Sequence, residues 1–206
     1  TPLGQNRPIF TLKSLLKDAK YQRLDYLEHS DTNLDGLQQQ VETFMKKLIR
    51  QTGWDQSSSD HISPRPLNIK AFRHLDLTET NEDGTINKSI MRTGVFYSNK
   101  CEDHVKTMDV TETQLESDDY LVYYAKVICF FEVVYDNRKK YRLCALQRYD
   151  TIDTPHPTGY QTLVSSSLAV CCVEHILEKV YVVPDFGDES GKRFLLNVVS
   201  GIIEDG

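Results

Sequence analysis

Residues 31–42, DTNLDGLQQQVE, place oxygen-bearing groups at the spacing of a calcium-binding loop. The ligands of such a loop would be Asp31, Asn33, Asp35, the backbone carbonyl of Leu37, and the bidentate carboxylate of Glu42. Gly36 stands where the loop needs a sharp turn. Because Ca²⁺ prefers oxygen ligands in this arrangement, calcium binding is one chemistry that the stretch could perform.

The neighbours of this loop favour a helix start instead. EF-hand loops usually come in pairs and are flanked by apolar residues, whereas Ser30 precedes this loop and Gln38 fills its eighth position. The nearest second candidate, ETNEDGTINKSI, ends in Ile90 where a glutamate is required. Ser30, Asp31 or Thr32 could cap a helix that begins near Asn33, and an acidic group there suits the helix dipole. We therefore predict no metal site, and an EF-hand-like calcium protein remains an alternative.

A basic hairpin offers a second possible chemistry. Its cationic side chains could grip phosphates while neighbouring tyrosines stack on bases; they are Arg138, Lys139, Lys140, Arg142 and Arg148. The formal net charge of the whole chain is −6, so only a local patch could attract a polyanion. A chain with this net negative charge attracts basic partners, such as histone tails, more readily than it attracts polyanions. Nucleic-acid binding through this hairpin is therefore possible but not favoured.

The sequence lacks the patterns of common catalytic sites. The serines at 165–167 stand outside any G-x-S-x-G turn, and the 10 glycines form no phosphate-binding loop. Cys172 and His175 have no second close pair of zinc ligands. We therefore predict that the protein is not an enzyme and carries no cofactor.

Aromatic residues are more suggestive of a binding role. The chain has 11 tyrosines and 8 phenylalanines, and several tyrosines stand near the ends of expected strands. Aromatic side chains at the rim of a barrel can hold a methylated lysine by cation–π attraction, although most tyrosines simply pack in cores. The residues predicted to bind a partner are Tyr97, Tyr123, Tyr124, Tyr149 and Asp150.

The elements that would position these residues differ between the two halves of the chain. From residue 10 to about 52, apolar residues recur at steps of three and four, which predicts two amphipathic helices. The polar stretch QSSSDHISPRP indicates a linker, and NEDGT indicates a turn. We assign 9–53 to a helical docking or dimerisation element and 54–88 to a linker and irregular segment. Any oligomer is expected to form through the helices.

β-Branched and aromatic residues, which favour strands, dominate the second half. YLVYYAKVICFFEVVY at 120–135 predicts a long, bent strand, DNRKK a hairpin turn, and 141–149 the returning strand. Further strands are expected at 91–98, 160–172, 175–184 and 193–199. The predicted fold class is α+β, with an N-terminal segment of two helices followed by a curved antiparallel sheet or small β-barrel over 89–200.

Composition restricts where such a protein could work. Of the 206 residues, 39 % are hydrophobic and 26 % are charged, which is adequate for a packed core. No run approaches the roughly 18 apolar residues of a membrane helix, so we predict no membrane association. The 5 cysteines show no CxxC spacing, and several lie in apolar strand-like runs. This pattern favours a reducing, intracellular compartment.

The second half resembles the bromo-adjacent homology (BAH) domain. The matching segments are a Y-x-A-K/R-V strand at 123–127, the hairpin strand at 141–149, and a V-x-V-x-P type strand at 176–186. Similar strands occur in transposon-encoded proteins of fungi and their relatives. The resemblance implies a nuclear, chromatin-associated binding or scaffold module, a complex subunit that engages a histone tail or another protein partner through its β-barrel.

Overall fold

The computed structural model describes residues 9–13, 22–51, 67–72, 74–80, 84–96, 99–113, 120–135, 139–152, 160–186 and 191–196. Its helical elements are α1 (Leu24–Ser30), η1 (Thr32–Leu34), α2 (Leu37–Gln51) and η3 (Val173–His175). Its strands are β1 (Ile9–Lys13), β2 (Gln22–Arg23), β3 (Asn68–Phe72), β4 (His74–Thr80), β5 (Ile86–Phe96), β6 (Asn99–Glu102), β7 (His104–Thr113), β8 (Tyr120–Tyr135), β9 (Lys139–Ile152), β10 (Gln161–Cys172), β11 (Ile176–Pro184) and β12 (Arg193–Leu196).

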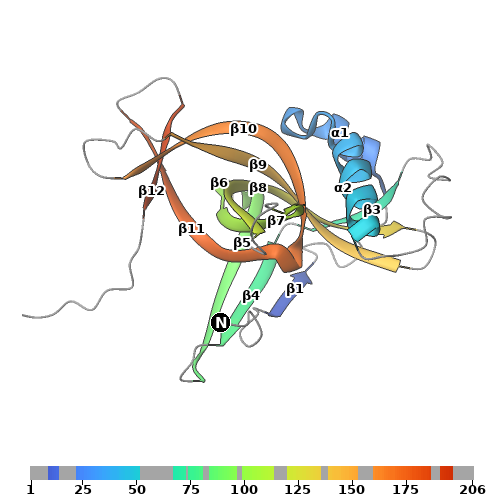
Figure 1. Cartoon of the computed structure of the whole chain (residues 1–206), viewed down its shortest axis with the longest axis horizontal. Coiled ribbons are helices and arrows are strands. Elements are labelled where there is room, and N and C mark those ends of the chain that lie inside the picture. The colour runs from blue at the N-terminus through green and yellow to red at the C-terminus, as the bar shows by residue number, and fades with distance from the viewer. Residues whose placement is uncertain are drawn as a thin grey trace, which may run out of the picture.

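Six of these strands form a closed ring of antiparallel pairings (Figure 1). The order is β8–β7–β11–β12–β10–β9, and β9 pairs back onto β8. β3 and β2 extend the same sheet from the C-terminal half of β8, where Ile69 lies opposite Val133. The prediction of an antiparallel sheet in the second half of the chain is confirmed.

β8 contributes to two cores because the side chains of a strand alternate between its two faces. Phe130 packs in a cluster that includes Leu75 and Met91 from the hairpin of β4 and β5. The next residue, Phe131, packs in a second cluster that includes Val41 of α2. Both phenylalanines are fully buried. β8 therefore fixes the ring to the hairpin on one side and to the helix on the other.

A second sheet, β1–β4–β5–β6, contains three strands that the sequence did not predict, β1, β4 and β6. β4 and β5 pair around the turn predicted at NEDGT, where Gly84 has a φ of 80° that residues with a Cβ rarely adopt. Leu75 and Leu77 are buried, and Asp76 between them faces the other way. The linker and irregular segment expected over 54–88 is thus corrected, because β3 and β4 lie within it. Such short strands, with few apolar residues each, give a weak pattern.

The N-terminal segment also differs from the two helices expected there. Ile9–Lys13 forms β1, in which Phe10 lies opposite Leu77 of β4. Helical structure in the described part of this segment begins at Leu24, and α1 is short, so α2 is its one long helix. The spacing from Leu12 onward suits a helix, but the ladder with β4 satisfies the same backbone groups.

α2 lies beside β10 and β7 of the ring (Figure 1). Its apolar stripe, which includes Leu37, Val41, Phe44 and Met45, is buried against the strands, as its spacing predicts. The opposite side of α2 is polar. Within the described ranges, no helix combines the length and the apolar character that crossing a membrane requires.

Candidate functional site

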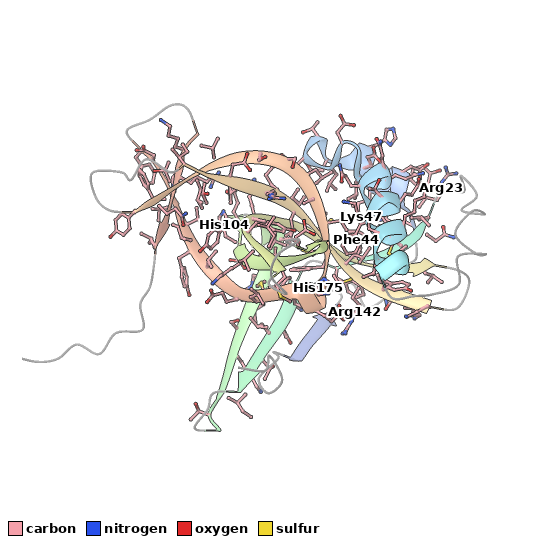
Figure 2. All side chains as sticks on the ribbon, in the orientation of Figure 1. Arg23, Phe44, Lys47, His104, Arg142 and His175 are labelled. Carbon is pink, nitrogen blue, oxygen red and sulfur yellow. The ribbon has the colours of Figure 1, made fainter. Side chains whose placement is uncertain are left out.

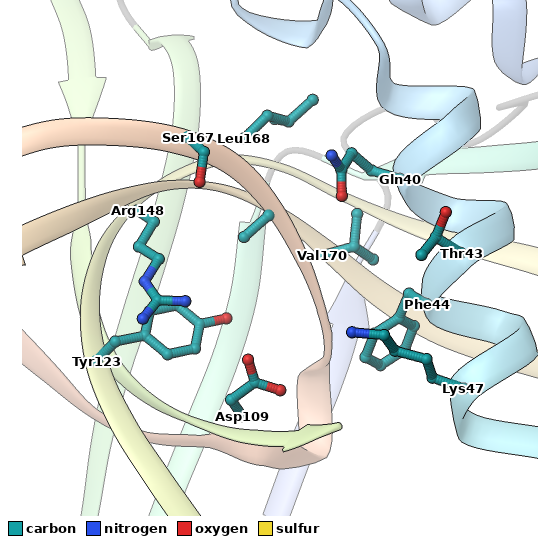
Figure 3. Close-up of a pocket in the computed structure, with 11 residues that line it drawn as sticks. Gln40, Thr43, Phe44, Lys47, Asp109, Tyr123, Arg148, Ser167, Leu168 and Val170 are labelled. Carbon is teal, nitrogen blue, oxygen red and sulfur yellow. The ribbon is translucent and has the colours of Figure 1, made fainter. Parts of the chain in front are cut away.

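A pocket of about 180 Å³ lies between α2 and the strand ring (Figure 3). We call it the α2 pocket; it is lined by Gln40, Thr43, Phe44 and Lys47 of α2, Asp109 of β7, Tyr123 of β8, Arg148 of β9, and residues 167–170 of β10. β10 changes register against β9 between Ser165 and Leu168, so this strand is irregular where it borders the pocket. Helix α2 and four ring strands therefore meet at one concave site.

Two residues that the sequence analysis assigned to different functions meet in this pocket. Tyr123 is a predicted partner-binding residue, and Arg148 is a predicted phosphate-binding residue. The guanidinium carbon of Arg148 lies 4.7 Å from the centroid of the Tyr123 ring, a cation–π contact. Burial raises the pKa of the Tyr123 phenol well above its ordinary value, so the hydroxyl stays protonated. The buried ring is thus a fixed surface on which the guanidinium lies.

α2 brings a second cation to the pocket. Lys47 follows Phe44 by three residues, so the two side chains share one face of the helix. Both point from α2 toward the ring, Phe44 buried and Lys47 exposed to solvent (Figures 2 and 3). Lys46 is equally exposed but does not line the pocket, which makes it a natural control for Lys47.

Most of the basic hairpin points elsewhere. Its ion pairs with neighbouring carboxylates are Lys140–Glu132 (3.2 Å) and Arg142–Glu174. Lys139 is exposed and lies over the ring of Tyr141. Arg138 lies outside the described residues. Of the described members of this set, Arg148 is the one that lines the α2 pocket.

The predicted partner-binding tyrosines are divided between two places. Tyr124 and Tyr149 are cross-strand partners in a small cluster separate from the α2 pocket. Tyr149 is buried, and its hydroxyl lies 3.0 Å from Nε2 of His104. Asp150 is exposed on β9, and Tyr97 lies outside the described residues. The tyrosines that the structure describes therefore do not form a single aromatic cage.

A network of charged side chains surrounds His104. Its ion pairs are Glu102–Lys126 (3.7 Å), Glu102–Arg193 (3.4 Å) and Asp103–Lys179 (2.8 Å). Burial lowers the pKa of His104 to about 4, and the nearby positive charge of Arg193 acts in the same direction. The imidazole is therefore neutral at pH 7. The network ties β8 and β12 to Glu102 at the end of β6, and β11 to Asp103 between β6 and β7, which is a structural role.

The chain matches no protein-family model, no curated protein and no solved structure. The chemistry of the α2 pocket is therefore inferred from its side chains alone. Lys47 and Arg148 supply positive charge, and Asp109 supplies one carboxylate. Hydroxyl and amide groups of Thr43, Ser167 and Gln40 complete the polar wall. This set can hold a polar group by charge and hydrogen bonds.

Of these polar residues, Arg148 alone was predicted as a site residue; Gln40, Thr43, Lys47, Asp109 and Ser167 were not. Lys47, Asp109 and Ser167 belong to no motif, and they come from segments that are far apart in the chain. The one local signal was the position of Lys47 at the edge of the apolar stripe of α2. The contact between α2 and the ring, which creates the pocket, had no signature in the sequence.

The residues of the calcium-loop pattern lead into a helix, but the prediction of one helix that begins near Asn33 is wrong: η1 ends at Leu34, Gly36 has a φ of 79°, and α2 begins at Leu37. The carboxylate of Asp31 accepts a hydrogen bond from the backbone N–H of Asn33 (2.9 Å) and so caps η1. Leu37 already lies in α2 and is fully buried. Among the described residues, no three His, Cys, Asp or Glu side chains gather closely enough to hold a metal ion. Asp31, Asp35 and Glu42 therefore do not converge.

Glu28 holds the start of α2, and no sequence pattern pointed to it. One of its carboxylate oxygens accepts a hydrogen bond from the N–H of Gly36 (2.9 Å), and the other accepts one from the N–H of Gln38 (3.1 Å). The first N–H groups of a helix have no partner within the helix, and the helix dipole favours a negative charge there. A residue of α1 thus caps α2 from outside.

Replacing Glu28 with glutamine is expected to lower the free energy of unfolding by about 1–2 kcal/mol, because the negative charge and one acceptor are lost. Glu42→Gln is the matched control, since Glu42 accepts a side-chain hydrogen bond from Gln38 within the helix. Its expected effect is about 0.5 kcal/mol or less. Urea denaturation followed by circular dichroism measures both variants. Equal losses would contradict the capping role of Glu28.

Proposed function

We propose that the protein is a non-catalytic module that binds a protein partner, and that the α2 pocket receives one side chain of that partner. The observation that carries this proposal is the size and lining of the pocket. Its volume of about 180 Å³ is room for one side chain. Pockets for cofactors and drug-sized ligands usually measure roughly 300–1,000 Å³. A side chain is therefore the better fit.

A scaffold role is favoured over the reading of methylated histone lysines. A methyl-lysine cage needs exposed aromatic faces. Arg148 already lies over the ring of Tyr123, and Tyr149 is buried beside His104. A cationic ligand in the α2 pocket would also meet the like charges of Arg148 and Lys47. The partner is thus better described as a protein that is not recognised through a methylated lysine.

The resemblance to the BAH domain is the basis for proposing the cellular location of this module and the complex to which it belongs. The resembling segments 123–127, 141–149 and 176–186 fall mainly on β8, β9 and β11, three strands of the ring. We infer that the ring is a small β-barrel of BAH-like kind and that the protein is a nuclear subunit of a chromatin-associated complex. Nucleic-acid binding is a weaker alternative, because Lys140 and Arg142 of the hairpin pair with carboxylates.

Ser167→Trp tests the pocket without changing its charge. An indole at this position should fill the α2 pocket, whereas Ser165→Trp places the same group at an equally exposed site of β10 outside the lining. The tagged full chain and both variants are used for cross-linked pulldown from nuclear extract. We expect Ser167→Trp to reduce recovery of the specific partner at least about tenfold, a loss of about 1.4 kcal/mol of binding free energy, and Ser165→Trp to leave it unchanged. Equal recovery with both variants would contradict the proposal.

A histone-peptide array separates the scaffold role from the histone reader. We expect the array to stay blank while the wild-type chain still recovers its partner. Tight binding of a methylated histone peptide that Ser167→Trp abolishes would instead make the protein a reader.

A further inference from the structure

The two cations of the α2 pocket, Arg148 and Lys47, differ from the ion-paired cations of the ring strands. The basic residues on the ring strands that pair with a carboxylate include Lys106, Lys126, Lys140, Lys179, Arg142 and Arg193. Among the residues that the structure describes, Arg148 and Lys47 form no such pair. Arg148 and Lys47 thus line the same pocket without a carboxylate partner, whereas the described lysines Lys46, Lys70 and Lys88, which also form no ion pair, do not line it. Arg148 and Lys47 are available to an anion from outside the chain.

Arg148 is held in a position suited to a carboxylate. Its guanidinium lies over the buried ring of Tyr123, which restricts the motion of an otherwise flexible side chain. The planar group presents its N–H donors as a fork that matches the two oxygens of a carboxylate. Because this geometry exists before any ligand binds, less conformational freedom is lost on binding.

The charge balance of the pocket selects a monoanion. Among the side chains that line the pocket, Lys47 and Arg148 each carry one positive charge and Asp109 carries one negative charge, so the formal charge of the lining is positive. One carboxylate restores neutrality. A phosphate dianion would bring a second negative charge into the pocket. The carboxylate of Asp109, which lines the same small space, would repel it.

We propose that the α2 pocket binds the carboxylate of a glutamate or aspartate side chain on the protein partner, with Arg148 as the bidentate donor and Lys47 as the second cation. This inference rests on the proposed function, since it names the chemistry of the side chain that the pocket receives. Asp109 sets the charge of the pocket and so discriminates against phosphorylated residues.

Small amino-acid derivatives test the inference on the full chain, with no need for the partner. The probes are the N-acetyl, N-methylamide derivatives of glutamate, glutamine, lysine and O-phosphoserine. Binding is followed by NMR titration, including the Nε–H resonance of Arg148. We expect the glutamate derivative to bind at least about tenfold more tightly than the glutamine derivative, because a charge-assisted hydrogen bond is roughly twice as strong as a neutral one. We also expect it to bind more tightly than the lysine and phosphoserine derivatives.

Charge-removing variants locate the binding group. Arg148→Gln and Lys47→Gln are each expected to weaken binding of the glutamate derivative at least about fivefold. Lys46→Gln, on the same helix but outside the lining, should leave it unchanged. Lys47 is exposed, so its variant keeps the test valid even if Arg148→Gln folds poorly. Preference for the lysine or phosphoserine derivative, or equal binding by wild type and Lys47→Gln, overturns the inference.

The outcomes also separate this inference from the proposed function. If Ser167→Trp abolishes partner recovery but the glutamate derivative does not bind, the pocket is a docking site of another chemistry and the inference fails alone. If the glutamate derivative binds as expected but Ser167→Trp leaves recovery unchanged, the pocket takes carboxylates but is not where the partner docks. In that case the inference and the proposed function both fail as statements about the partner.

Discussion

Replacing Phe131 with alanine is expected to lower the free energy of unfolding by about 3–5 kcal/mol. Phe131 is fully buried where β8 meets α2, in the same cluster as Leu37, Val41 and Met45. Removing its ring leaves a cavity that α2 can close only by moving, because the helix is also held by the hydrogen bonds of Glu28 to its first turn. The lost stability therefore has two parts: the hydrophobic free energy of burying the ring, and the cost of the cavity that the ring leaves behind.

Equilibrium urea denaturation measures this effect. Phe131→Leu, a smaller deletion, provides a folded variant with an intermediate loss if the alanine variant does not fold. Val122→Ala, at a residue of β8 that is 43 % exposed, is the control and should change stability by less than about 1 kcal/mol. A loss for Phe131→Ala no larger than that of the control would mean that α2 does not depend on this contact.

Acidification from pH 7 to pH 4 is expected to remove about 3 kcal/mol of stability through His104 alone. The pKa of His104 is lowered from 6.5 to about 4 in the folded chain, chiefly by burial. Between these two values the unfolded chain binds a proton that the folded chain does not, so stability falls as the pH falls. Each pH unit inside this window costs up to about 1.4 kcal/mol. Above pH 7 and well below pH 4, His104 contributes no slope.

The comparison with His104→Gln isolates this contribution. Glutamine keeps a polar group near the hydroxyl of Tyr149 but does not titrate. The groups that face His104 are Arg193, Glu102, Lys126 and Asp103, and all of them remain in the variant. We therefore expect the difference in stability between wild type and variant to shrink steadily from pH 6.5 to pH 4.5 in urea titrations. A difference that is constant over this range would show that His104 is protonated equally in both states.

Five of the six ring strands could be predicted because their residues carry a strong pattern, whereas β7 was not predicted. β8 spans Tyr120–Tyr135, the segment that the sequence indicates, because aromatic and β-branched residues are buried on both of its faces. Its bend also has a cause, since the pairing with β9 shifts register between Val127 and Cys129. β4 was missed because Leu75 and Leu77 alone mark its buried face. β1 was read as part of a helix because leucine spacing does not report pairing with a distant strand.

The candidate site was predictable only in part, for a related reason. Tyr123 and Arg148 could be selected by residue type, but their contact depends on the register of β8 against β9, where Arg148 lies opposite Ala125. Tyr149 was selected for the same chemical reason and instead packs with His104, because it faces the opposite side of the sheet. A shift of one residue in a strand exchanges its faces, so residue type alone could not separate the two tyrosines.

The order of the strands in the ring has a consequence for the kinetics of folding. The pairings β7–β8, β8–β9, β9–β10 and β11–β12 join strands that follow each other in the chain, so each closes a short loop. The pairings β7–β11 and β10–β12 do not, and β7–β11 brings Val105 to Lys179. Loop-closure entropy makes such distant contacts the slow ones. We therefore expect a row of hairpins to form early and the ring to close late, when β11 reaches β7.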